Sequence, residues 1–171
     1  MSKTAPEQTM ADPTVARRVL QVEHITMETT KTFADVAAAL ERSVLQLDPA
    51  IGAALADGDE QQATALERGA PLFIFLKRDH GALLQVTGQR RKALQYEIGN
   101  PHTASKMTRH RLAAGLYAPL RVILYENEKG GSTFEYDQPS SLFGQFDDEQ
   151  VSAVARGLDA ALEHALRQAA E

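Results

Sequence analysis

The chain contains no cysteine among its 171 residues. Disulfide bonds, thiolate metal sites and cysteine nucleophiles are therefore excluded together. A chain without cysteine also suits a reducing compartment, so we expect the protein to be cytoplasmic.

Long apolar runs are also missing. No stretch approaches the roughly 20 apolar residues that a membrane helix needs, so we expect no membrane-spanning segment. Residues 1–15 are rich in threonine, proline and charge, and they lack the apolar middle of a signal peptide. We expect them to be a disordered N-terminal segment that leads into a single domain, residues 16–171.

Basic residues are fewer than acidic ones. Eighteen lysine and arginine residues stand against 23 aspartate and glutamate residues, which leaves a formal net charge of −5. An acidic chain is repelled by nucleic-acid phosphates and by anionic lipids, so neither is an expected partner. The hydrophobic fraction of 43% is enough for a substantial core.

The motifs of several common active sites are absent. The chain has no phosphate-binding Walker loop and no glycine pattern of a Rossmann fold. Ser140-Ser141 is not part of a Gly-x-Ser-x-Gly elbow, so nucleophilic hydrolysis lacks its usual geometry. The five histidines form no His-x-His or His-x-x-x-His pair. A metal or haem would need ligands from distant segments, such as His24, His80 and His110, and we assign neither.

The first half of the chain mixes strand and helix patterns. Residues 19–30 predict a strand with a bulge or a change of face near Glu23, where the apolar positions switch parity. Thr32 is a suitable N-cap for a helix that Asp48-Pro49 ends. Short helices are expected at residues 51–56 and 61–68. The apolar run at 72–76 predicts a strand that is buried on both faces, and residues 83–86 fit a short helix or a strand equally well.

The middle third has the clearest local signals. Residues 94–98 alternate between apolar and polar side chains and predict a strand. Asn100 followed by Pro101 predicts a helix start, because asparagine caps the first turn and proline suits the first helical position. A second strand at 120–126 leads through a glycine turn at 127–131 into a return strand.

The last element is a long amphipathic helix from residue 148 to about residue 168. Its apolar stripe consists of Val151, Val154, Ala155, Leu158, Ala161, Leu162, Ala165 and Leu166. Phe146, Asp147, Gln150 and Val151 predict a hydrophobic staple and a capping box at its start. We expect this helix to lie across a sheet face or against a second copy of itself.

The order of several short motifs resembles the domain of unknown function 302 family. The motifs are Asp79-His80 after an apolar strand, Gly99-Asn100-Pro101, Met107 and Ala118-Pro119-Leu120. The likeness covers about residues 22–162. It implies a compact α+β domain with a curved, largely antiparallel sheet and helices mostly on one face. It also suggests a homodimer, and it implies no catalytic activity.

The start of the helix at Asn100 is the first candidate site. A helix N-terminus offers unpaired N–H groups and a partial positive charge, which suit a phosphate or a carboxylate. Thr103 and Ser105 would add hydroxyl groups, and Lys106 a positive charge. The alternative is a well-capped helix with only water at its end.

Two charged clusters are further candidates. In Asp79-His80, the carboxylate would orient the imidazole for proton transfer only on a turn, because adjacent strand residues point to opposite faces. The alternative is a polar strand end. The basic group around Arg109, with Lys106, His110 and Arg111, would bind an anion or an acidic partner, or would be a solvated helix face.

The leading hypothesis is a non-catalytic binding module for a small apolar or anionic ligand. Its predicted binding residues are Tyr96, Asn100, Thr103, Lys106, Tyr117, Arg121 and His80. The second hypothesis is a homodimeric structural or interaction protein that pairs through a strand edge or the final helix. The third is an enzyme that uses His80 or His110 as an acid–base, although the sequence nominates no reaction.

Overall fold

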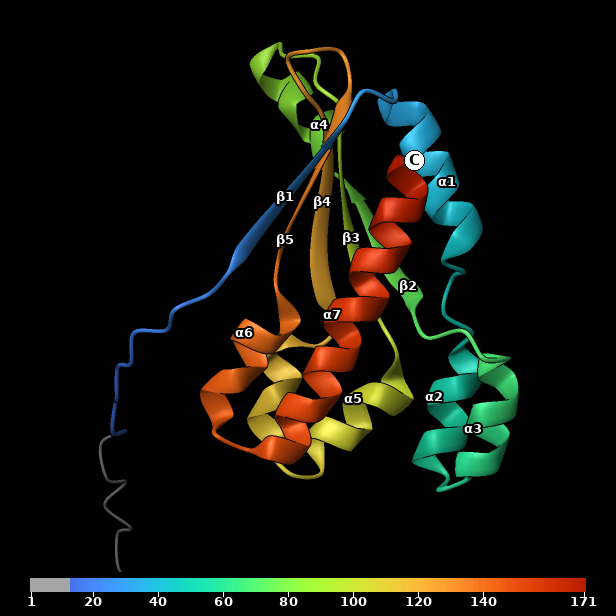
Figure 1. The fold of residues 1–171 in the computed structure, drawn as a ribbon, viewed down its shortest axis with the longest axis vertical. Helices are drawn as coiled ribbons and strands as arrows, with labels where there is room; N and C mark the ends of the chain where they lie inside the picture. The colour runs from blue at the N-terminus through green and yellow to red at the C-terminus, as the bar shows by residue number, and fades with distance from the viewer. Residues whose placement is uncertain (1–12) are drawn as a thin grey trace, which may run out of the picture.

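The structure is a computed structural model that describes residues 13–171, so most of the predicted disordered segment, residues 1–15, lies outside the described residues. One antiparallel sheet has the strand order β1-β5-β4-β3-β2 (Figure 1). The strands are β1 (His24–Thr29), β2 (Phe73–Asp79), β3 (Ala93–Gly99), β4 (Leu120–Glu126) and β5 (Ser132–Asp137). The predicted α+β class with a largely antiparallel sheet is confirmed.

Helices lie in all the connections between the strands except the turn between β4 and β5. The α-helices are α1 (Phe33–Ser43), α2 (Pro49–Ala56), α3 (Glu60–Glu67), α4 (His80–Leu83), α5 (Pro101–Thr108), α6 (Pro139–Phe143) and α7 (Glu149–Ala170). The 3₁₀ turns are η1 (Leu84–Thr87), η2 (Leu112–Tyr117) and η3 (Gly144–Phe146). The predicted long C-terminal helix is α7. Within the described residues, no helix combines the length and the apolar character needed to cross a membrane.

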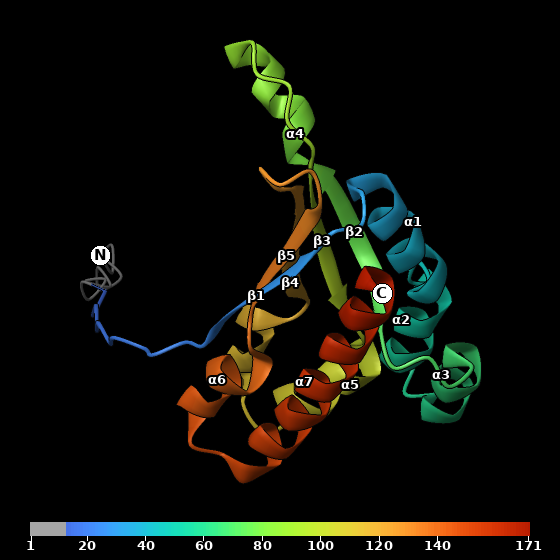
Figure 2. The same cartoon turned by 45° about the horizontal axis from the view of Figure 1, so that its top comes forward.

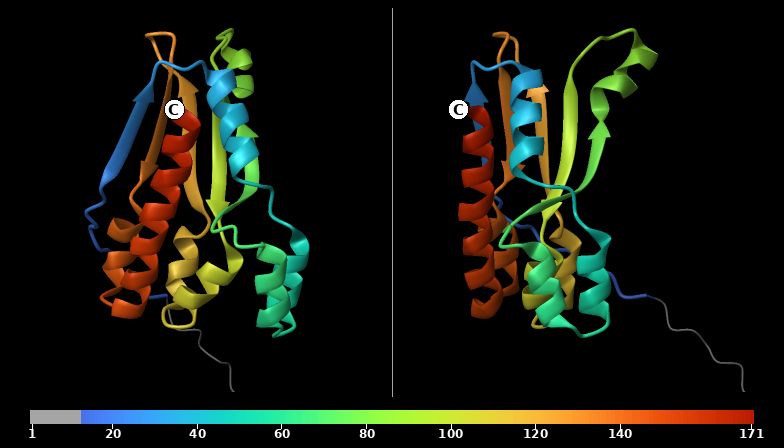
Figure 3. Two further views of the ribbon diagram at one scale, coloured as in Figure 1. Left: turned by 45° about the vertical axis from the view of Figure 1, so that its right-hand side comes forward. Right: turned by 90° about the vertical axis from the view of Figure 1, so that its right-hand side faces the viewer.

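Helices α1 and α7 lie side by side over one face of the sheet (Figures 1 and 3). The strand side chains that face them are buried, among them Tyr96, Val122 and Phe134. The alternate side chains form the opposite face, where Glu135, Ile123 and Gln95 are cross-strand neighbours and remain partly exposed. This alternation is typical of an antiparallel sheet that is covered on one face only.

Side-chain caps start these two covering helices. The Thr32 hydroxyl accepts a hydrogen bond from the Asp35 N–H at 3.2 Å, as the predicted cap of α1 requires. The cap of α7 is Asp148, whose carboxylate accepts from the Gln150 and Val151 N–H groups. The prediction of Asp147 for this role was wrong by one residue, because Asp147 adopts the left-handed conformation that ends η3.

The prediction that the apolar run at 72–76 is buried on both faces was wrong. Strand β2 is an edge strand of the sheet. Phe73 and Ile74 are buried, but Leu76 is 41% exposed on the uncovered face. Phe73 packs under α2 and α3 rather than under the main helical layer. The apolar run at 72–76 therefore occurs in an edge strand, because the α2–α3 hairpin, which is separate from the main helical layer, covers its first residues.

The predicted first strand is shorter than expected. Strand β1 begins at His24, and residues 13–23 have no regular secondary structure. The backbone of Glu23 still bonds to the loop after β5, since its N–H donates to Ser141 Oγ and its carbonyl accepts from Gln138. The sheet therefore gains no strand pairing from the apolar residues between 19 and 22.

The middle third forms the predicted hairpins. Strands β3 and β4 pair from Ala93 opposite Tyr125 to Ile98 opposite Leu120, and β4 returns into β5. Gly131 is needed after the turn, because a Cβ there would stand 2.1 Å from the carbonyl oxygen of Thr29. The tight approach between this turn and the end of β1 therefore depends on the glycine.

The connection between β2 and β3 is helical and projects from the domain. Residues 80–92, called the arm here, contain α4 and η1 and extend beyond the end of the sheet (Figures 2 and 3). This settles the ambiguity at residues 83–86 in favour of helix. Leu83 and Val86 are 66% and 91% exposed on the arm. A Cβ at Gly81 would stand 2.3 Å from the Arg91 carbonyl oxygen, so a glycine is required where the two sides of the arm meet.

Candidate functional site

An apolar cavity lies beside the first turns of α5. Its volume is about 80 Å³. Its walls come from β2, from the end of β3, from α5, from the segment before β4, and from α6 and α7. The lining residues are Phe75, Gly99, Asn100, Pro101, Thr103, Ala104, Met107, Ala118, Pro119, Leu120, Phe143 and Leu158. Asn100 and Thr103 supply the only polar side chains of this set.

Local backbone chemistry shapes two of these walls. The pairing of β2 with β3 shifts register between Ile74 and Leu76, so Phe75 falls in a bulge. A bulge redirects a side chain from the regular alternation of a strand, and Phe75 contributes to the cavity wall. Gly99 lies between the Phe75 ring and Pro119, and a Cβ built on it would be in ordinary van der Waals contact with both, at 3.5 Å.

The N–H groups at the start of α5 are already used. Pro101 has none, and the Asn100 side-chain oxygen accepts from the His102 and Thr103 N–H groups at 2.8 and 3.1 Å. The Ala104 N–H donates to the Asn100 carbonyl at 2.9 Å. The strong helix start predicted from Asn100 and Pro101 is therefore present, but it leaves no N–H of the first turn directed at an anion.

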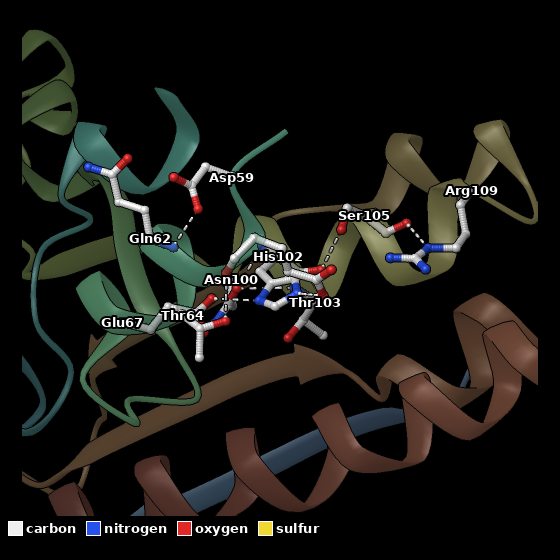
Figure 4. Close-up of polar contacts among 10 residues, drawn as sticks. Asp59, Gln62, Thr64, Glu67, Asn100, His102, Thr103, Ser105 and Arg109 are labelled. Atoms are coloured by element: carbon white, nitrogen blue, oxygen red, sulfur yellow. Dashed lines mark hydrogen bonds and ion pairs between the residues drawn. The ribbon is translucent and has the colours of Figure 1, made fainter. Parts of the chain in front are cut away.

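His102 does not line the cavity and lies instead in a cluster with charged residues of α3 (Figure 4). Its side chain is 8% exposed, and its Nε2 lies 2.9 Å from Glu60 Oε1. Its Nδ1 lies 3.5 Å from Glu67 Oε1, an oxygen that is buried without a hydrogen-bond partner among the described residues. Both carboxylates belong to α3, so this cluster joins the α2–α3 hairpin to α5.

Sequence reasoning noted His102 only as part of the helix start. Glu60 and Glu67 are 42 and 35 positions away in the sequence, and no local pattern links either of them to His102. Their seven-residue separation on one helix does place them on the same side, two turns apart. That spacing was the one available signal, although it does not indicate which residue lies between the two carboxylates.

Asn100 and Thr103 are the two predicted binding residues that line the cavity. Lys106 is exposed on α5 and does not reach it. Tyr117 packs edge-to-face on Phe143, with ring centroids 6.1 Å apart, so it supports the wall from behind. The predicted aromatic contribution therefore comes from Phe75 and Phe143 instead.

The other three predicted residues, Tyr96, Arg121 and His80, do not line this cavity. Tyr96 is fully buried under the helices, and its hydroxyl donates to Glu41 at 2.9 Å. Burial, together with this hydrogen bond, raises the pKa of Tyr96, so the phenol stays neutral. Arg121 is exposed on the uncovered face, because it is one residue out of phase with buried Val122.

His80 is at the far end of β3 from the cavity. The end of β2 next to His80 pairs with Leu94, whereas Gly99 pairs with the start of β2. Asp79 caps α4 through the Ala82 N–H at 2.8 Å, and His80 Nε2 lies 3.4 Å from Gln95 Oε1. The two neighbours therefore have separate partners and form no carboxylate–imidazole pair. Within residues 13–171, no group of three or more acidic or histidine side chains is arranged to hold a metal ion.

Comparison with known proteins identifies the family. The family model described as "Domain of unknown function DUF302" matches residues 61–169, which is more than half of the chain. The chain belongs to the DUF302 family. The matched region starts within α3, contains the cavity and the arm, and ends in the last turn of α7. The resemblance inferred from the short motifs is confirmed.

A solved DUF302 structure shares the fold. The crystal structure of an uncharacterized conserved protein DUF302 from Bacillus stearothermophilus superposes with a TM-score of 0.63 at 16% sequence identity. The superposition covers 85% of this chain and 97% of the other. At this identity the likeness shows the fold alone. A search of curated proteins finds no significant match.

Proposed function

We propose that this DUF302 protein binds a small, mainly apolar ligand in the cavity beside α5. The observation that carries the proposal is the composition of the walls, where ten of the twelve lining residues have no polar side-chain atom. A volume of about 80 Å³ exceeds the space that one water needs and is smaller than engineered cavities of about 150 Å³ that bind benzene. A short aliphatic chain suits this size.

Two polar groups at the wall would orient such a ligand. The Asn100 oxygen is used by the helix cap, but its side-chain amide and the Thr103 hydroxyl have no hydrogen-bond partner among residues 13–171. Each is able to donate to one oxygen atom of a ligand. We therefore favour a ligand with an apolar body and a single polar atom over a fully charged anion, for which the capped helix start offers no free N–H.

Binding of straight-chain alcohols from ethanol to hexanol tests the proposal, with NMR shifts of the Met107 methyl and the Thr103 amide as the readout. Affinity should improve with each added CH₂, by up to about 0.8 kcal/mol, until the cavity is full and the trend stops. Native mass spectrometry of freshly purified protein would show a co-purified molecule directly.

The variant Ala104→Leu fills the cavity from its wall and should abolish the shifts. Its matched control is Ala113→Leu, at an exposed position on η2 that does not line the cavity. If no alcohol shifts the wild-type signals, or if Ala104→Leu binds the alcohols as the wild type does, the cavity is not a ligand site.

We also propose that the protein acts as a homodimer in the cytoplasm. The arm supports the dimer, because Leu83 and Val86 are large apolar side chains that the domain itself leaves exposed. Light scattering at micromolar concentration provides the test. Val86→Glu should shift a dimer toward monomer, whereas a monomeric wild type would refute the proposal.

A further inference from the structure

A second cavity, larger than the one beside α5, lies at the base of the arm. Its volume of about 530 Å³ falls in the range of about 300–1,000 Å³ that small-molecule sites occupy. One wall is the arm itself, and the others come from α1, β2, β3 and β4 where the arm leaves the sheet (Figure 2). This cavity, called the arm cleft here, shares no lining residue with the cavity beside α5.

Two arginines of the arm line this cleft without an ion pair. Arg90 and Arg91 are exposed, and neither guanidinium group has a hydrogen-bonded or ionic partner among residues 13–171. Neighbouring residues of an extended segment usually point to opposite sides, yet both arginines line the same cleft. Two permanent positive charges are therefore available at one cavity.

The acidic side chains of the cleft already have partners. Glu126 Oε1 lies 2.7 Å from Lys92 Nζ, so the charges of these two groups offset each other. Asp79 accepts a hydrogen bond from the Ala82 N–H at 2.8 Å and so caps α4. The three basic and two acidic side chains leave one positive charge in excess, in a chain whose net charge is −5. Arg90 and Arg91 are thus the groups that an anion would meet.

The arginines lie at the fixed base of the arm. Gly81 approaches the carbonyl oxygen of Arg91 too closely for a Cβ. The Glu126 N–H donates to the Lys92 carbonyl oxygen at 3.0 Å, which ties the returning side of the arm to the end of β4. Because these contacts hold the backbone, a ligand would have to order only the two side chains, and a preorganised site loses less entropy on binding.

The same cleft offers an apolar surface for the rest of a ligand. Phe33 at the start of α1 and Leu94 on β3 line it and are partly buried. The side-chain amide of Gln85 has no hydrogen-bond partner among the described residues and can both donate and accept. Leu83 and Val86, which support the proposed dimer, do not line the cleft, so the two surfaces are separate.

We propose that the arm cleft binds an organic phosphate monoester. Such a group carries a charge of about −1.5 to −2 at pH 7, which two arginines match. Its oxygens accept the paired N–H groups of guanidinium in bidentate hydrogen bonds. Arg90 and Arg91 hold the phosphate, and the organic part lies against Phe33 and Leu94. The protein therefore has a second binding site, for a charged ligand, in addition to the apolar cavity beside α5.

Phenyl phosphate is the probe, with NMR shifts of the Phe33, Gln85 and Leu94 amides as the readout. It should shift these signals and leave the Met107 methyl unchanged, because Met107 lines the other cavity. Phenol lacks the charge and inorganic phosphate lacks the ring, so each should bind at least about tenfold more weakly. The proposal is overturned if phenyl phosphate causes no shifts, or if either comparison compound binds as tightly.

The double variant Arg90→Gln and Arg91→Gln removes both charges from the cleft. Because a hydrogen bond to a charged group is worth about tenfold or more in affinity, it should bind phenyl phosphate at least about a hundredfold more weakly. Arg42→Gln is the matched control, since Arg42 is exposed in the last turn of α1 and does not line the cleft. If the double variant binds as the wild type does, the anion is held elsewhere and the proposal fails.

Ala82→Phe fills the cleft from the arm and keeps both arginines. It should abolish the shifts, and the cap of α4 should remain because Asp79 bonds to the backbone N–H of this residue. Unchanged binding would show that phosphate rests on the arginines outside the cleft, which contradicts the proposal. The urea midpoint should match that of the wild type in every variant, because all the substituted positions are exposed.

Discussion

The molecule has two apolar cores that are held together in different ways. The main core fills the space between the sheet and the α1–α7 layer and includes fully buried Phe134, Tyr96 and Leu162. The satellite core has four buried residues, Ile51, Ala54, Ala63 and Phe73. A large core is stable through its buried apolar area. So small a cluster buries too little apolar area by itself and depends on caps and ion pairs.

Strand β2 joins the two cores. Ile74 packs into the main core, and the preceding residue, Phe73, packs into the satellite core. Neighbouring residues of a strand point to opposite sides, so an edge strand can serve two layers of helices at once. We expect damage in the main core to affect the whole domain and damage in the satellite core to stay local.

The largest effect is expected for Phe134→Ala. This side chain is completely buried on the interior strand β5, and its removal should lower the free energy of unfolding by about 3–5 kcal/mol. Urea unfolding followed by far-UV circular dichroism measures the change. Ile123→Ala on the uncovered face is the control and should cost much less, and equal losses for both would show that the two faces are not energetically different.

Ile51→Ala should remove about 2–3 kcal/mol, at the low end of the usual range because a small cluster can partly collapse. We expect this loss in the opening free energy of residues 49–70 by hydrogen exchange. The urea midpoint of the domain should shift little. A fully cooperative loss in the global midpoint would mean that the two cores unfold as one unit.

Asn100→Ala tests the helix start that lies between the cavity and the His102 cluster. Loss of the two hydrogen bonds to the cap should cost about 1 kcal/mol in the urea experiment. Asn100→Asp keeps an acceptor at the same position and should retain most of the stability. If the aspartate variant is as unstable as the alanine variant, the side-chain amide rather than the cap is the stabilising group.

The smallest effect is expected at the exposed edge of the main sheet. Hydrogen bonds to Asp137, at 2.9 Å, and to Glu135 raise the pKa of His24 above its usual range. Because the folded pKa is the higher one, this contribution is complete below about pH 6.5 and is lost as the pH rises through the folded pKa. The side chain is 54% exposed, so solvent screening limits the contribution to less than about 1 kcal/mol.

Urea titrations of the wild type and of His24→Gln at pH 5.5 and pH 8 provide the measurement. The difference between the two proteins should be greatest at pH 5.5 and should shrink at pH 8. A difference that grows with pH would contradict the direction of the shift. Because His24 joins β1 to β5, this effect belongs to the main sheet and should leave the hairpin of the satellite core unchanged.

The sequence predicted the elements whose signals are local. The cap and proline at Asn100-Pro101, the alternation at 94–98 and the apolar stripe of α7 each reside in one short segment, and each appears in the structure as expected. The apolar run before Lys77 gave the wrong prediction of a strand buried on both faces. An apolar side chain does not indicate whether the main helical layer or a separate hairpin covers it.

The sequence by itself therefore determined the family and those helices and strands that have strong local signals, since propensity, capping and periodicity act over a few residues. Only the tertiary structure decided which side chains meet. Tyr96 lies in the core, and Arg121 lies on the uncovered face. Phe75 and Phe143 line the cavity. His102 lies between the two carboxylates of Glu60 and Glu67. Such encounters depend on the packing of whole elements across long sequence separations, and no local pattern encodes them.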